Sequence, residues 1–117
     1  MIPAPIKPPI TLDHLAAVDI RVGTIRSVDN VPGADKLVAL RVSFGDHERT
    51  IVVGLKMERA DPHEILDKQA LFVVNLASRK MKGVFSEGML FDIGYADGLV
   101  PALASPEWPM PDGARAG

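Results

Sequence analysis

The residues best suited to chemistry lie between positions 75 and 89 of the chain. Three cations, Arg79, Lys80 and Lys82, are separated only by Met81, and clustered Lys and Arg side chains attract phosphate groups. The same stretch holds three side chains able to meet a nucleobase: Asn75, Ser86 and Met89. A hydroxyl can hydrogen-bond a base edge or a 2′-OH, and a thioether can lie against a base face. The stretch predicts a phosphate-binding surface with base contacts.

Each of these residues also has a plainer interpretation. A basic triplet between strands is often a solvated loop, here kinked by Gly83. Met89 could fill the core where a strand begins, and Asn75 could be a buried amide that pins a bulge. Ser86 could close a turn. Only one aromatic residue, Phe85, adjoins the cations, and this scarcity favours a folded RNA recognised by shape and backbone over a generic single-strand binder.

The flanking segments read as strands. Apolar and β-branched residues predict five of them, over residues 18–28, 37–44, 49–53, 70–76 and 88–93. In the first strand the alternation slips at Gly23-Thr24, where we expect a bulge or sharp bend. The composition of residues 45–48 predicts a hairpin between the second and third strands.

Two short helices complete the expected elements. Thr11 is placed to cap a helix over Leu12–Ala17, with Ile10 and Leu15 as a hydrophobic staple. Asp61, Pro62 and Glu64 predict a capping box ahead of Ile65. A helix between strands three and four is the OB-fold position, so we predict an all-β, five-stranded OB-fold barrel with short helices and a C-terminal extension. An SH3-like barrel is the rival.

The bulk properties fit one small domain. A chain of 117 residues with 47% hydrophobic content can bury a modest core. Residues 1–10 carry four prolines and predict an extended arm, which leaves residues 11–117 for the domain. The net charge is −2, so any nucleic-acid binding must come from a local patch. With no signal peptide and no membrane-length apolar span, we expect a cytoplasmic protein.

Catalysis finds little support in the residues. Ser86 has no neighbouring histidine, because His14, His47 and His63 are scattered along the chain. His63 with Asp61 and Glu64 suggests a metal site at first sight, but helix capping explains those positions. There is no cysteine and no glycine-rich phosphate loop. We therefore expect neither an enzyme nor a cofactor or metal.

Several motifs together resemble a known family. They are Val18–Gly23, Ala34–Leu37, Gly54-Leu55, Asn75–Leu90 and Pro109–Ala114. The chain is similar to the tRNA-binding domain family, which includes C-terminal extensions of some methionyl-tRNA synthetases, endothelial monocyte-activating polypeptide II and the CsaA proteins. The resemblance implies tRNA as the partner, and it places the Ser-x-Gly-Met positions, Ser86 and Met89, in the tRNA contact.

The sequence departs from that family pattern at three positions. Ser78 stands where proline is usual, Val53 where serine is common, and Glu87 where glutamine is frequent. Glu87 adds a negative charge beside the cations, which should lower RNA affinity. A Ser-Glu pair here also resembles the CsaA branch, whose chaperone role in protein export makes an unfolded polypeptide or an export component the alternative partner.

The family also implies a homodimer, formed by the N-terminal helix and the segment after the barrel. The residues agree, since residues 99–108 carry Leu99, Val100, Leu103 and Trp108, more apolar surface than we expect five strands to absorb. We therefore expect the dimer to bury that segment and the apolar side of the helix.

Overall fold

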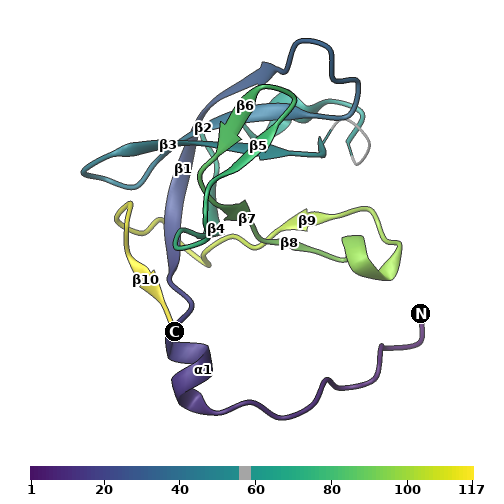
Figure 1. Cartoon of the computed structure of the whole chain (residues 1–117), viewed down its shortest axis with the longest axis vertical. Coiled ribbons are helices and arrows are strands. Elements are labelled where there is room, and N and C mark those ends of the chain that lie inside the picture. Colours follow the sequence, from purple (N-terminus) through teal and green to yellow (C-terminus); the bar gives the residue numbers. More distant parts are fainter. Residues whose placement is uncertain (56–58) are drawn as a thin grey trace.

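The computed structural model describes residues 1–55 and 59–117 (Figure 1). Helical elements are α1 (Leu12–Ala16), η2 (Pro62–Ile65) and η3 (Tyr95–Asp97). The strands are β1 (Ile20–Asn30), β2 (Val38–Ser43), β3 (Glu48–Val53), β4 (Gln69–Val73), β5 (Arg79–Met81), β6 (Val84–Ser86), β7 (Met89–Leu90), β8 (Asp92–Ile93), β9 (Ala102–Leu103) and β10 (Arg115–Ala116). Residues 1–10 are exposed and belong to no helix or strand.

The long strand β1 organises the barrel. The main sheet has the antiparallel order β3-β2-β1-β4-β7. The first half of β1 pairs with β4, from Ile20 to Thr24, and its second half pairs with β2, from Thr24 to Asn30. Four consecutive residues of β1, 22–25, are buried, so the strand is covered on both faces where it changes partner.

The bend in β1 does not lie where the alternation slips. We expected a bulge at Gly23-Thr24, but the register against β2 shifts between Ile25 and Ser27. Gly23 serves close packing instead. A Cβ there would lie 2.5 Å from a methyl of Val42 and 2.9 Å from the ring of Phe44. The glycine lets the side chains of Val42 and Phe44 lie close to the backbone of β1. The sequence pattern could not distinguish this close approach from a bulge.

Contacts between β3 and the segment before β7 nearly close the barrel. The Glu87 N–H donates to the carbonyl of Thr50 at 2.8 Å, and the Val52 N–H donates to the Ser86 hydroxyl at 3.0 Å. The enclosed core contains Ile25, Val28, Val38, Leu40, Val42, Phe44, Ile51, Leu55, Ile65, Ala70, Phe72 and Leu90. This confirms the expected OB-like, five-stranded barrel, with η2 between β3 and β4.

The helix caps agree with the sequence in part. The Thr11 hydroxyl accepts from the His14 N–H at 3.2 Å, and the Asp61 carboxylate accepts from the His63 N–H at 3.1 Å. The second half of the expected capping box is wrong, because the Glu64 carboxylate instead accepts a hydrogen bond from the Arg59 guanidinium. The second helix is a single 3₁₀ turn.

The C-terminal extension is joined to the barrel. Strand β9 pairs with β8, and Leu103 packs against the barrel core, so the barrel absorbs part of the segment that we expected to be surplus. Strand β10 pairs with the start of β1. Beside it the Thr24 hydroxyl donates to the Asp112 carboxylate at 2.5 Å, and the Gly113 N–H donates to the Val22 carbonyl at 2.8 Å.

Candidate nucleic-acid interface

The basic segment is a β-hairpin. We expected a glycine-kinked loop, but β5 and β6 pair in register, joined by the two residues Lys82 and Gly83. Both turn residues have positive φ, 50° and 84°, as in the type I′ turn that matches the twist of paired strands. The second turn position suits glycine for this reason. The three cations Arg79, Lys80 and Lys82 are therefore held by a regular β-hairpin.

One face of this hairpin packs on a second, smaller core. Met81 and Val84 are paired across the hairpin and contact the cluster of Val31, Ala34 and Val52. Because side chains alternate along a strand, the next pair, Lys80 and Phe85, lies on the opposite face. Phe85 is exposed, as are Arg79, Lys80 and Lys82.

The small core also brings a second loop to the hairpin. Val31 and Ala34 belong to residues 31–37, which connect β1 to β2. Loops between the first and second strands and between the fourth and fifth strands of an OB-fold bind oligonucleotides. The first of these loops carries the exposed Lys36, which our sequence reasoning missed as a site residue. Its place in the Ala34–Leu37 family motif was the signal that could have found it.

Ser86 lies at the contact with β3 that closes the barrel. Its side chain accepts from the Val52 N–H at 3.0 Å and donates to the Gly88 carbonyl at 3.1 Å, and the residue is 5% exposed. Two protein partners and this burial leave the hydroxyl little access to RNA. We therefore leave Ser86 out of the proposed contact surface, although the sequence pattern and the family resemblance pointed to it.

Replacing Ser86 by alanine is expected to destabilise the fold and spare RNA binding. The substitution removes the acceptor of a buried N–H, and an unsatisfied buried donor costs about 1–3 kcal/mol. Denaturant unfolding and tRNA affinity should be measured on the same sample, with the exposed Ser78→Ala variant as control. Lower tRNA affinity at unchanged stability would restore Ser86 to the contact surface.

Glu87 is held against the neighbouring strand. Its carboxylate accepts from the Thr50 N–H at 3.1 Å, and the Arg49 guanidinium donates to its backbone carbonyl at 3.2 Å. We expected the Glu87 charge to oppose the nearby cations. The structure also gives the carboxylate a structural role, because it helps to bond β3 to the chain that follows β6.

Asn75 belongs to a different part of the surface. Its amide oxygen accepts from the Asp19 N–H at 2.8 Å, and its amide nitrogen donates to the Ala17 carbonyl at 2.6 Å. It therefore pins the junction of α1 and β1, and it is exposed, unlike the buried amide of the plainer interpretation. Met89, in β7, is 44% exposed. RNA contact by either residue stays a prediction.

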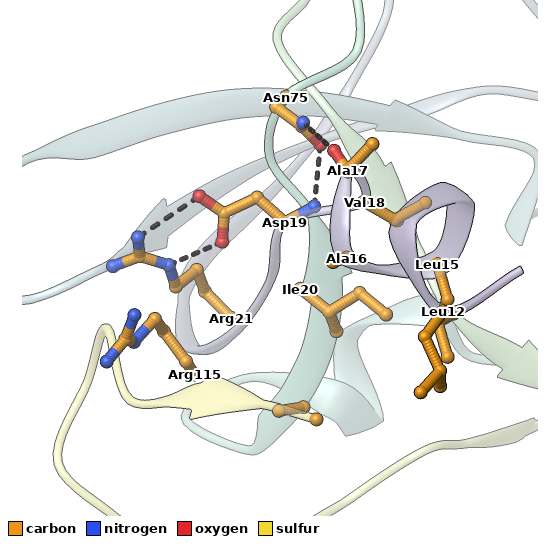
Figure 2. A pocket seen from close by; sticks show the side chains of 12 residues that line it. Leu12, Leu15, Ala16, Ala17, Val18, Asp19, Ile20, Arg21, Asn75 and Arg115 are labelled. Atoms are coloured by element: carbon orange, nitrogen blue, oxygen red, sulfur yellow. Dashed lines mark hydrogen bonds and ion pairs between the residues drawn. The ribbon is translucent and has the colours of Figure 1, made fainter.

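Asn75 lines a groove of about 950 Å³ between α1 and β10 (Figure 2). Leu12, Leu15 and Ile20 lie toward one end of it, and Arg21 and Arg115 toward the other. The Arg21 guanidinium donates to the Asp19 carboxylate at 2.6 Å, and this hydrogen bond lowers the pKa of Asp19 below its ordinary value. The groove thus combines an apolar end with a charged end.

Comparison with known proteins identifies the family of this chain. A family model described as "Putative tRNA binding domain" matches residues 20–115. The chain belongs to this tRNA-binding domain family. Among its curated relatives, the methionine–tRNA ligase of Parabacteroides distasonis is 41% identical over 111 residues, which is 95% of this domain and 16% of the ligase. That of Nitrosomonas europaea is 36% identical over 112 residues, 96% of this domain and 16% of the ligase.

This tRNA-binding domain therefore spans about a sixth of the ligases that it matches. Among solved structures, the MetRS related protein from Pyrococcus horikoshii has a TM-score of 0.86 at 33% identity, over 95% of this domain and all of that chain. The chaperone CsaA from Bacillus anthracis str. Ames has a TM-score of 0.80 at 20% identity, over 94% and 100%. The latter likeness shows the shared fold alone.

The described part of this tRNA-binding domain comprises residues 1–55 and 59–117. That part of the chain contains no cluster of three or more His, Cys, Asp or Glu side chains arranged to hold a metal ion. None of its helices has the length and apolar character needed to cross a membrane.

Proposed function

We propose that this domain binds tRNA, without catalysing a reaction, through cations on the β5–β6 hairpin and the loop 31–37. The observation that carries the proposal is the small core of Val31, Ala34 and Val52, which packs these two loops together. Membership of the tRNA-binding domain family supports tRNA as the ligand. Their exposed cations are Lys36, Arg79, Lys80 and Lys82. In the described part of the chain none of the four forms an ion pair, so their charges are available to phosphates.

Assembly as a homodimer is part of this proposal. Helix α1 has only five residues and buries none of them, and so short a helix is not stable in water without packing partners. Leu12 is 83% exposed and Leu15 54% exposed. After the barrel, Val100 and Trp108 are also largely exposed. A two-fold axis would let two chains cover these apolar surfaces.

A second candidate function is binding of unfolded polypeptide, as a CsaA-like chaperone working with a component of protein export. The groove beside α1 favours it, because one end is apolar and the other carries Arg21 and Arg115. An extended peptide with apolar side chains could bind such a groove. Either function would be carried out in the cytoplasm.

Salt dependence separates the two functions. Four phosphate contacts predict that tRNA binding weakens roughly 50- to 150-fold between about 50 and 200 mM salt, because condensed counterions are released on binding. Capture of apolar polypeptide should persist or strengthen over that range. Affinities for tRNA and for a permanently unfolded polypeptide should be measured side by side. Salt-independent tRNA binding, or a preference for the polypeptide at every salt concentration, would contradict the proposal.

A further inference from the structure

An exposed aromatic ring stands on the outward face of the β5–β6 hairpin. Phe85 is 58% exposed, and its cross-strand partner is Lys80, whose ammonium nitrogen lies 5.7 Å from the ring centre. This distance is within the range of a cation–π contact. The ring therefore has a cation over one of its faces, in one of the two loops with which OB-folds bind oligonucleotides.

The hairpin strand that carries this ring is held in a defined position. The next cross-strand pair, Met81 and Val84, lies on the opposite face of the hairpin and packs on the small core. The following residue, Ser86, is anchored to β3 through the Val52 N–H. The strand that carries Phe85 is thus anchored, and the ring itself is open to solvent. A single exposed apolar residue is ordinary on protein surfaces, but an exposed ring with an adjoining cation, on an anchored hairpin in an OB-fold ligand loop, is the arrangement that binds bases.

We propose that Phe85 and Lys80 form a stacking site for one unpaired nucleobase. The ring offers the base the face that lies away from Lys80, and the Lys80 ammonium group can neutralise a phosphate flanking that nucleotide. Inside a duplex, away from its ends, both faces of each base are covered by neighbouring base pairs. The nucleotide at the hairpin must therefore come from a loop or a single-stranded end of the RNA. This inference rests on the proposed function and adds the chemical class of the contacted nucleotide.

The test uses the full chain with two RNA probes: a short single-stranded oligouridine, and a blunt RNA duplex of matched phosphate number. Phe85→Leu removes the ring and keeps an apolar side chain, so the hairpin should stay folded. We expect its affinity for oligouridine and for tRNA to fall roughly 5- to 150-fold, the range for loss of one stacked base. Its affinity for the duplex, which presents phosphates but stacked bases, should not change.

Two further variants serve as controls. Phe85→Trp should retain the affinity of the unmodified chain, since it restores an aromatic face. Tyr95→Leu removes an aromatic side chain of similar exposure, 62%, from η3 outside the hairpin, and it should have no effect.

The possible outcomes separate the inference from the proposed function. If Phe85→Leu binds tRNA and oligouridine as tightly as the unmodified chain while loss of the hairpin cations weakens both, the stacking site is wrong and the tRNA function stands. An equal loss of duplex affinity in Phe85→Leu would likewise overturn the stacking site. If the unmodified chain binds no RNA, both proposals fall.

Discussion

Replacing Arg79, Lys80 and Lys82 together by alanine is expected to weaken tRNA binding roughly 30- to 80-fold at about 0.2 M salt. Each cation that neutralises a phosphate releases about 0.7–0.9 counterions, and the resulting gain in affinity vanishes toward 1 M salt. Three lost contacts should therefore reduce the slope of log affinity against log salt by about two to three units. The fold should be unaffected, because all three side chains are exposed.

Filter binding or fluorescence titration across a salt series measures both quantities in one experiment. A matched control variant, Lys7→Ala with Arg26→Ala and Lys68→Ala, removes the same positive charge from exposed residues outside the two loops. If the control weakens binding as much as the hairpin variant, net charge governs binding. If the hairpin variant binds tRNA as tightly as the unmodified chain, the hairpin is not part of the site.

Introducing charge on the apolar side of α1 is expected to dissociate the dimer. Leu12→Asp with Leu15→Asp would place carboxylates in the proposed interface, and an unpaired buried charge costs about 3–5 kcal/mol. The dissociation constant should rise at least about a hundredfold. Helix α1 is too short to persist in water without packing partners, so it is expected to unwind on dissociation, while the barrel stays folded. Sedimentation velocity at micromolar concentrations measures the change.

Leu66→Asp is the control for this experiment, because Leu66 is 45% exposed and follows η2, outside the proposed interface. It should remain dimeric. An unmodified chain that sediments as a monomer at micromolar concentrations would remove the dimer from the proposal. A two-fold dimer presents two hairpins to one folded RNA. If both hairpins contact the same molecule, the variant with Leu12→Asp and Leu15→Asp should also bind tRNA more weakly.

Short-range patterns in the sequence predicted most of the scaffold. The Thr11 cap, the Asp61 cap and the second and third strands depend on residues within a few positions of one another, and each appears in the structure. The OB-like barrel followed from the strand count and from the helix between strands three and four. The three cations were found because they are adjacent in the chain.

Other features depend on contacts between distant residues. The register shift between Ile25 and Ser27 arises in the pairing of β1 with β2, which the alternation within β1 does not report. Glu64 binds Arg59, whose guanidinium also donates to the carbonyl of the distant Pro101. Lys36 joins the candidate site only because Val31 and Ala34 pack with the hairpin. Short-range sequence patterns carry no information on such contacts.

The sequence by itself determined that this chain carries a cluster of cations between two strands of a small barrel. Only the tertiary structure decided which side chains near those cations face outward. The type I′ turn at Lys82 and Gly83 sets the register of β5 against β6, and successive residues then point to opposite faces. Closure against β3 buries Ser86 and leaves its neighbour Phe85 exposed, because burial depends on which strand lies across from each face.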